Sequence, residues 1–385
     1  MVFSAFSLFD LSLFEIFCVT TLALCFLFQM WFVFGRVNRI RILKTNAQHS
    51  ETQFTPHVSV IICAKNEEEN LTNFLPSVLT QDYPNYQVVV VNDSSEDNSE
   101  LILAQFKSKY SHLYYTNIPI DKKFSHGKKL AISIGVKAAT HNYLVFTDAD
   151  CKPASNKWLE TMVQGFKPEG KEIVIGFGGY LKQKGITNLI IRYDTFFTAL
   201  QYMGFAFSGK PYMGVGRNLA YKKDLFIKND GLKSHLNILS GDDDLFVKET
   251  ATKQNVSIVT NPDAHTISVP HKTLNHWRLQ KARHLTTAHL YNFSVKSELI
   301  LEPISREIFW FMIFYMIISN TFALVSIGFL IVNYLIKILI WKKIAKILNQ
   351  GKLYWSLLLF DFIHPWILLW AFFSKRKGTK IRKWK

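Results

Sequence analysis

The chain has 385 residues, 49% of them hydrophobic and 15% aromatic, so its length allows one large domain or two and its composition is too apolar for an ordinary soluble enzyme. Its net charge is +16, but the basic clusters adjoin apolar runs and no aromatic-interleaved basic motif is present, so we expect anionic lipid and no nucleic acid as a partner. The four cysteines have no paired spacing, which indicates neither a disulfide framework nor a zinc site.

Three apolar segments, at 16–34, 301–335 and 353–373, are long enough to cross a bilayer as helices. The first is interpreted as an anchor and not as a cleaved signal peptide, because residues 1–15 contain no Lys or Arg and include Asp10 and Glu15. Lys and Arg follow the first and the last segment, and such enrichment marks the cytoplasmic side. We therefore expect an integral protein of an inner or plasma membrane whose central block faces the cytoplasm.

The segment 335–352 conflicts with a simple three-span topology, because its lysines would fall on the outer side. Their spacing beside Ile338, Trp341 and Ile344 suits an amphipathic interfacial helix. The expected organisation is a transmembrane anchor at 1–35, a basic linker at 36–55, a cytoplasmic domain at 56–295, transmembrane and interfacial helices at 301–374, and a basic tail at 375–385.

The cytoplasmic block begins with alternating strand and helix patterns. Apolar, β-rich runs at 58–64, 86–91 and 143–147 predict strands, and the segments 67–79 and 127–139 predict helices between them. This order predicts an α/β fold with a mainly parallel central sheet, and ligands of such sheets bind beyond the carboxyl ends of the strands. The candidate residues at those ends are Ala64, Asn66 and Glu67, then Asp93, then Asp148 and Asp150, with Lys128 in the first turn of the second helix.

These residue types suit a nucleotide diphosphate. A leaving group of that kind needs a divalent cation to absorb its charge, and Mn²⁺ or Mg²⁺ prefers carboxylate oxygen. An Asp-x-Asp pair such as Asp148 and Asp150 is common in loops and helix caps when it stands alone. Its place after an apolar strand, beside other strand-end acids, makes it a candidate metal site.

Seven motifs occur in order: IICAKNEEEN at 61–70, VVNDSSED at 90–97, Lys128, TDAD at 147–150, GRNLAY at 216–221, SGDDDL at 240–245 and QKARH at 280–284. Together they resemble the ordered motif set of membrane-anchored family 2 glycosyltransferases, a group that includes polysaccharide synthases and lipid glycosyltransferases. The resemblance covers about residues 56 to 285. It implies a GT-A fold, a nucleotide-sugar donor and inversion at the anomeric carbon.

The resemblance also implies roles for individual residues. Ala64, Asn66, Glu67 and Asp93 would hold the nucleoside, with Asp93 on the base, while Lys128 and Asp148 would secure the nucleotide and Asp150 would ligate the cation. Gly216, Arg217 and Asn218 would shape the pocket for donor sugar and acceptor. An equally weighted interpretation is that Gly214 and Gly216 form a tight turn before the strand 219–221. The glycines can form this turn and shape the pocket at the same time.

The run Asp242-Asp243-Asp244 supplies a candidate general base. An attacking acceptor hydroxyl must lose its proton, and a carboxylate can take it at neutral pH. The spacing to Leu245 indicates Asp242, whereas the Gly-Asp-Asp form of other members indicates Asp243, and the sequence leaves both open. The alternative is an acidic first turn of a helix at 245–252, which the helix dipole favours.

The last motif departs from the processive pattern, in which a Trp follows the Arg. Gln280 and Arg283 are present, but His284 replaces that Trp and could be an acceptor contact, a phosphate donor or a satisfied polar residue. Arg283 suits a diphosphate. The aromatic segment 186–207 is interpreted as core or interfacial packing, in preference to the alternative of a lipid-acceptor groove.

These features predict inverting transfer from a nucleotide sugar, with a UDP-sugar as the expected donor, to a membrane lipid or lipid-linked glycan. The first alternative is the catalytic subunit of a processive polysaccharide synthase. A catalytically silent membrane sensor of nucleotide sugars, or a scaffold, is the second. The donor sugar and any partner subunits are not specified by the sequence.

Overall fold

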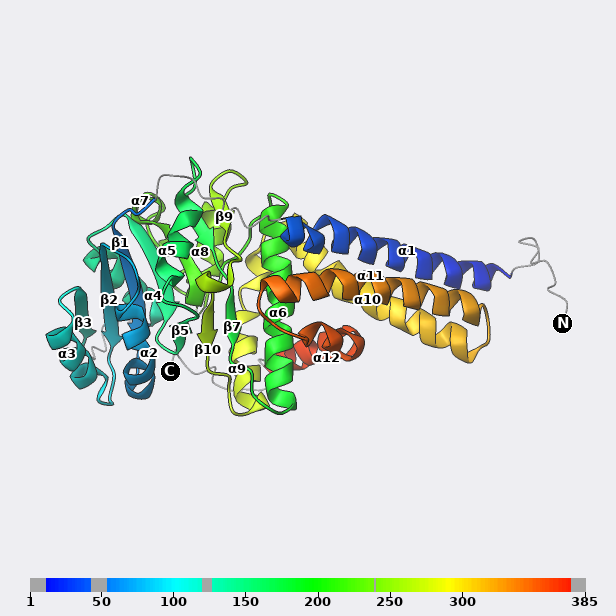
Figure 1. Ribbon diagram of the computed structural model, residues 1–385. Helices are drawn as coiled ribbons and strands as arrows, with labels where there is room; N and C mark the ends of the chain where they lie inside the picture. The colour runs from blue at the N-terminus through cyan, green and yellow to red at the C-terminus, as the bar shows by residue number, and fades with distance from the viewer. Residues whose placement is uncertain (1–11, 43–53, 120–126, 239, 375–385) are drawn as a thin grey trace.

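An α/β body and a bundle of long helices that projects from it make up the chain (Figure 1). The computed structural model describes residues 12–42, 54–119, 127–238 and 240–374. The basic tail at 375–385 and most of the basic linker that the sequence predicts therefore lie outside the described residues.

The central sheet has seven strands, and four neighbouring ones run parallel. Its order is β3 (Leu113–Ile118), β2 (Tyr86–Asp93), β1 (Val58–Ala64), β4 (Tyr143–Asp148), β8 (Leu219–Lys222), β6 (Ile173–Ile175) and β9 (Val256–Ile258). Strand β8 is antiparallel to both of its neighbours, and β6 and β9 are parallel to each other. The prediction of an α/β fold with a mainly parallel sheet is confirmed. Strand β1 is buried along its whole length, as expected of an apolar run covered on both faces.

Helices cover the two faces of this sheet. They are α2 (Glu68–Leu79), α3 (Ser99–Lys109), α4 (Lys128–Ala138), α5 (Trp158–Val163), α7 (Lys223–Lys228) and α8 (Asp244–Thr250). Helix α4 packs closely, because a Cβ at Gly135 would stand 2.7 Å from the side chain of Ile61 on β1. That close approach fixes the N-terminus of α4, which carries Lys128, against the carboxyl ends of β1 and β4.

A second, small sheet lies beside the end of β4. It has the order β5 (Cys151–Pro153), β10 (Thr266–Ser268), β7 (Gly178–Tyr180). Because β5 begins directly after Asp150, the turn between the two sheets holds the Asp148-Ala149-Asp150 segment in place.

Helix α6 (Ile186–Phe207) stands between the α/β body and the bundle (Figure 1). Its aromatic residues are in the core: Tyr193, Phe196 and Tyr202 are each at most 2% exposed. The segment is therefore packing, as interpreted from its sequence. Further along the chain, α9 (Leu274–His284) packs against the C-terminal helix α12 (Leu357–Phe373) through Arg278, whose guanidinium lies 4.7 Å from the ring centre of Trp370.

The projecting bundle consists of α1 (Leu13–Gly35), α10 (Phe293–Ile318) and α11 (Ala323–Ile347) (Figure 1). Among the described residues, three helices are long and apolar enough to cross a membrane: Leu13–Arg41, Ala323–Ile347 and Leu353–Phe373. The first and third predicted spans agree with these. The second, at 301–335, is wrong in extent, because the chain turns at 319–322, where Asn320 and Phe322 have φ of 54° and 53°.

The lysine-rich segment 335–352 differs from the interfacial helix that the sequence suggested. Residues 335–347 continue α11 without a break. Lys337 is only 3% exposed, and its Nζ lies 3.2 Å from Asp361 Oδ1 on α12. Trp341 packs on the rings of Phe196 and Phe197 of α6. The end of α11 is therefore inserted between neighbouring helices and abuts the α/β body.

Candidate active site

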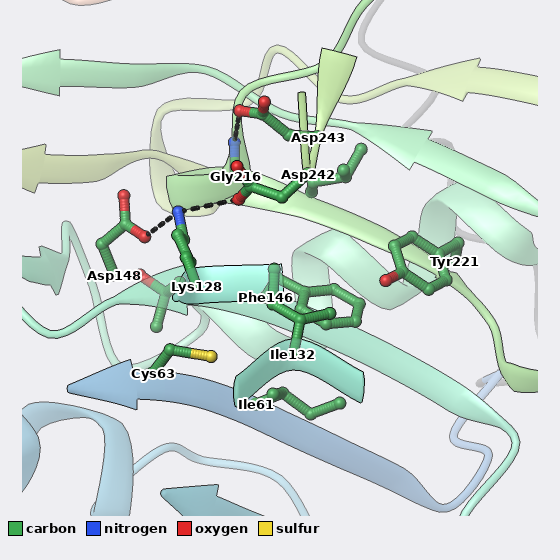
Figure 2. A pocket seen from close by; sticks show the side chains of 12 residues that line it. Ile61, Cys63, Lys128, Ile132, Phe146, Asp148, Gly216, Tyr221, Asp242 and Asp243 are labelled. Atoms are coloured by element: carbon green, nitrogen blue, oxygen red, sulfur yellow. Dashed lines mark hydrogen bonds and ion pairs between the residues drawn. The ribbon is translucent and has the colours of Figure 1, made fainter. Parts of the chain in front are cut away.

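The strand ends, the start of α4 and the start of α8 meet at one place (Figure 2). The ammonium nitrogen of Lys128 lies 2.8 Å from Asp148 Oδ1 and 3.1 Å from Asp242 Oδ2, so one cation joins two carboxylates that are far apart in the sequence. A pocket here is lined by Cys63 and Ile61 of β1, Phe146 of β4, Tyr221 of β8 and the same charged groups.

Lys128 remains a cation in this position. Burial alone would lower its pKa, but Asp148 and Asp242 outweigh that effect and raise the pKa well above its ordinary value. The lysine is thus a fixed positive charge between the end of β4 and the start of α8.

Asp148, Asp150 and Cys151 form the group best placed to hold a metal ion among the described residues. One ligand atom from each lies within 4.8 Å of the others. The two carboxylates offer the hard oxygen donors that Mn²⁺ and Mg²⁺ prefer, so they fit such an ion. Burial raises the pKa of the Cys151 thiol, and its sulfur lies 2.9 Å from Ser268 Oγ, so Cys151 is a neutral, hydrogen-bonded neighbour of the carboxylates.

The three consecutive aspartates have three different environments. Burial would raise the pKa of Asp242, but Lys128 outweighs it and lowers the pKa, so Asp242 is ionised. Asp243 accepts hydrogen bonds from the backbone N–H of Gly216 at 2.6 Å and of Asp244 at 2.8 Å. Burial, with Asp242 and Asp244 nearby, raises the pKa of Asp243 to about 7.

The third aspartate turns away from the pocket. Asp244 is buried and accepts hydrogen bonds from the hydroxyl of Tyr291, at 2.7 Å, and from Thr287 Oγ1. It therefore ties α8 to the segment after α9. Sequence reasoning missed this link, since nothing in the pattern at 287–291 points to a carboxylate partner.

The proposed nucleoside residues lie in the loops after β1 and β2, which are hydrogen-bonded together. The N–H of Asn66 donates to Ser95 Oγ, and the N–H of Glu96 donates to Asn66 Oδ1, both at 2.8 Å. The N–H of Glu67 donates to Ser99 Oγ at 3.0 Å. Ala64 and Asp93 are fully buried at the ends of their strands.

Asp93 belongs to the same electrostatic neighbourhood as the pocket. Burial raises the pKa of the Cys63 thiol, and the negative charges of Asp242, Asp148 and Asp93 add to that increase. Because Cys63 lines the pocket, all three carboxylates lie around one place.

A single helical turn, η4 (Gly216–Asn218), carries three of the candidate residues. A Cβ at Gly216 would stand 3.2 Å from Lys128 Nζ, so the absence of a side chain allows the close approach. The Arg217 guanidinium lies 4.7 Å from the ring centre of Tyr180. Asn218 lies in the core: its amide donates to the carbonyls of Phe177 and Ala264, and its oxygen accepts from Trp158. Its side chain therefore holds the turn and does not face the pocket.

Helix α9 brings the last motif to the edge of the site. The hydroxyl of Tyr180 donates to Gln280 Oε1 at 3.4 Å, and the positive charge of Arg283 lowers the pKa of Asp242. The side chain of His284 is exposed to solvent. The surrounding chain, with the cations Arg283 and Lys281 beside it, lowers the pKa of His284, so its imidazole is neutral at pH 7. Tyr180, which contacts both Arg217 and Gln280, was not identifiable from its own sequence context.

Comparisons with known proteins show which family and which fold the chain resembles. The family model described as "Glycosyl transferase family 2" matches residues 59–228. The glycosyltransferase AglE of Haloferax volcanii is 34% identical over 181 residues, which are 46% of this chain and 55% of that protein. A poly-beta-1,6-N-acetyl-D-glucosamine synthase of Staphylococcus epidermidis is 31% identical over 113 residues, 29% of this chain and 25% of that protein. The chain thus spans about half or less of the length of these relatives.

Solved structures show the same fold. The mannosyltransferase PcManGT from Pyrobaculum calidifontis, in complex with GDP-Man and Mn²⁺, superposes with a TM-score of 0.61 at 16% identity, over 96% of this chain and 100% of that chain. The fold, the family match at 59–228 and three helices long and apolar enough to cross a membrane lead to one conclusion: the chain contains a family 2 glycosyltransferase domain with a GT-A fold, beside candidate membrane-spanning helices.

Proposed function

We propose that this protein transfers a sugar from a nucleotide-activated donor to an acceptor at the membrane, with inversion of the anomeric carbon. The observation that carries the proposal is the Lys128 bridge, which joins the carboxylate of the Asp-x-Asp segment, at 2.8 Å, to that of the candidate base, at 3.1 Å. A displacement needs these two parts of the site next to each other, because the hydroxyl attacks the carbon from which the diphosphate departs.

The donor would lie across the carboxyl ends of the parallel strands. The nucleoside end of the donor would be surrounded by Asn66, Glu67 and Asp93. Positive charge for the diphosphate comes from Lys128, Arg217 and Arg283. The neutral His284 can donate or accept one hydrogen bond without adding charge. A divalent cation on Asp148 and Asp150 would stabilise negative charge on the leaving diphosphate.

Asp242 is the proposed general base. It is ionised, and it lines the same pocket as Asp148. Asp243 also lines the pocket, and its raised pKa suits proton transfer, but both of its oxygens already accept backbone hydrogen bonds. Asp244 is bound to Thr287 and Tyr291. We therefore assign the base to Asp242, the positioning of η4 to Asp243 and the positioning of α8 to Asp244.

The acceptor is proposed to be a membrane lipid or a lipid-linked glycan. One relative is named for synthesis of poly-beta-1,6-N-acetyl-D-glucosamine, so a growing polysaccharide is the second candidate. The replacement of the processive Trp by His284 favours the first. A UDP-sugar is the proposed donor, and a GDP-sugar is the alternative, because the structurally similar PcManGT was solved with GDP-Man.

The proposed orientation places the α/β body in the cytoplasm, where nucleotide sugars are made. Helix α10 accompanies α1 along its whole length: Arg36 pairs with Glu298 at 2.7 Å, Gln29 donates to the carbonyl of Glu302, and Phe14 packs on Tyr315. If α1 crosses the membrane, α10 therefore crosses it too, in the opposite direction. We infer that α1, α10 and α11 cross.

In this arrangement α12 lies on the cytoplasmic face and does not cross. Arg36, Lys342, Lys343 and the basic tail then all belong to the cytoplasmic side, as the enrichment of cations there requires. The turn at 319–322, which contains no charged residue, lies at the opposite end of the bundle.

A donor screen in native membranes tests the function. UDP- and GDP-sugars are supplied with Mn²⁺ or Mg²⁺, and the lipid fraction is analysed by mass. One added sugar on a lipid supports the first acceptor class, and a ladder of sugars supports the polysaccharide synthase. Donor binding without release of nucleotide or product from any acceptor would contradict the proposal and favour a sensor.

Two matched variants test the assignment of the base. Asp242→Asn is expected to lower the transfer rate by roughly 10²- to 10⁴-fold, the usual contribution of acid–base catalysis, and to leave UDP binding within a few-fold. Asp243→Asn is expected to retain most of the rate, because an amide oxygen can still accept from Gly216. The reverse pattern of rates would transfer the role to Asp243.

A further inference from the structure

A buried carboxylate on α6 joins the helix of the last motif to the membrane-facing helix α12. Asp194 is 5% exposed, and its Oδ1 lies 2.8 Å from Lys281 Nζ on α9 and 3.1 Å from His364 Nε2 on α12. His364 is 1% exposed and packs against the rings of Tyr193 and Phe197. Three helices from separate parts of the chain thus meet at one carboxylate.

The carboxylate is ionised at neutral pH. Burial would raise the pKa of Asp194, but Lys281 and the hydrogen bond from His364 outweigh it and lower the pKa to about 2. An ionised carboxylate accepts only, so Nε2 of His364 carries the proton and donates. In so apolar a setting, charge-assisted hydrogen bonds of this kind are strong and directional.

Lys281 lies within the Gln280–His284 segment. Gln280 accepts a hydrogen bond from Tyr180, and Arg283 acts on Asp242, whereas Lys281 extends to α6 and its Asp194. The helix is therefore in contact with the active site through some residues and with Asp194 through Lys281. A second contact to α12, Arg278 over Trp370, lies one turn earlier.

We propose that Asp194 is a positioning residue, which holds Arg283 and His284 at the donor diphosphate by fixing α9 to α12. The inference rests on the proposed function, because it assigns those two residues to the donor. Under this proposal, the geometry of the active site depends on how α12 packs, and therefore on the membrane surface on which α12 lies. An alternative explanation is a purely structural ion pair, whose loss would lower stability and leave each folded molecule equally active.

The test compares Asp194→Asn with a matched control in purified, detergent-solubilised full-length protein. Glu302→Gln removes another buried carboxylate, which lies 3.3 Å from Arg306 within the bundle and contacts neither α9 nor the pocket. Lys281→Arg keeps the ion pair, and Lys281→Met removes it without leaving a buried cation. Measurements are transfer kinetics per folded molecule, UDP affinity with Mn²⁺, and backbone hydrogen exchange of residues 273–285.

Asp194→Asn and Lys281→Met are expected to speed exchange in 273–285, to weaken UDP binding and to lower kcat by about 10- to 100-fold, the range that small misplacements cause. Lys281→Arg should retain wild-type values, and Glu302→Gln should lower the melting temperature only. Unchanged exchange and unchanged kcat per folded molecule in Asp194→Asn would overturn the inference. If the wild type transfers no sugar, the proposed function fails, while exchange and UDP affinity still decide the role of Asp194.

Discussion

At the scale of single residues, three consecutive aspartates have three different environments. Asp242 faces a lysine, Asp243 accepts from two backbone N–H groups, and Asp244 meets Thr287 and Tyr291. The sequence predicted that the run is functional, but register to Leu245 could not separate Asp242 from Asp243. The separation comes from Lys128 and Gly216, whose proximity is a result of folding.

Asp243 gives a stability prediction that depends on pH. Its pKa rises from an ordinary value near 4 to about 7 in the folded state, through burial and its aspartate neighbours, so folding favours the protonated form. The stabilisation is complete below pH 4 and is lost as pH rises through about 7. The melting temperature of Asp243→Asn, relative to wild type, should therefore increase between pH 5 and pH 8.

Scanning fluorimetry in detergent at several pH values measures this difference. Asp224→Asn serves as the control, because this aspartate lies on α7 at the other end of β8 and outside the pocket. A melting-temperature difference between Asp243→Asn and wild type that stays constant with pH would show that Asp243 does not titrate between pH 5 and pH 8 and would contradict a pKa near 7.

At the scale of elements, the sequence predicted the strands and helices whose bounds are determined by the local pattern of apolar and polar residues. The strand at 58–64 has the predicted bounds, and the helix expected at 67–79 begins one residue later, at Glu68. The span expected at 301–335 was wrong only in its bounds, since the candidate span is Ala323–Ile347 and apolar composition alone does not reveal the turn at 319–322. The contacts of Asp194 with α9 and α12 were also beyond prediction, since they join residues 87 and 170 positions apart.

The prediction at this scale concerns helix α4, because the packing of α4 against the central sheet determines the position of Lys128. Gly135→Leu would place side-chain atoms where Ile61 already lies 2.7 Å from a Cβ. Overpacking of this kind costs about 1–3 kcal/mol and should shift α4 away from the sheet. We expect a lower melting temperature together with weaker UDP binding, measured by fluorimetry and calorimetry.

Gly328→Leu is the matched control for that helix. This glycine also lies within a helix, α11, but a Cβ there meets nothing within 4 Å. The Gly328→Leu variant should bind UDP as the wild type does, without a loss of stability. Equal effects of the two substitutions would show that the packing of α4 does not determine the position of Lys128.

At the scale of the whole molecule, the bundle is held together by buried charge as well as by apolar packing. Arg306 lies near Glu302 and Asp361, and Lys337 bonds to both Asp361 and Gln29. Two cations and two carboxylates balance, so this cluster carries no net charge into the apolar region. Helix α10 carries Glu302 and Arg306 of this cluster and runs beside α1 throughout.

The pairing of α10 with α1 leads to a topology that can be measured. If α1, α10 and α11 cross, residue 319 is outside, and residue 374 at the end of α12 is inside with the α/β body. Single cysteines are introduced at Ser319, at Ser374 and, as the marker of the α/β body, at the exposed Thr72. The four native cysteines are buried and should react slowly.

A membrane-impermeant maleimide added to intact cells should label Ser319→Cys at once. Ser374→Cys and Thr72→Cys should react only after permeabilisation. Labelling of Ser374→Cys in intact cells would mean that α12 crosses the membrane, and His364 would then be inside the bilayer. Labelling of Thr72→Cys would place the α/β body outside, away from the nucleotide sugars on which the proposed reaction depends.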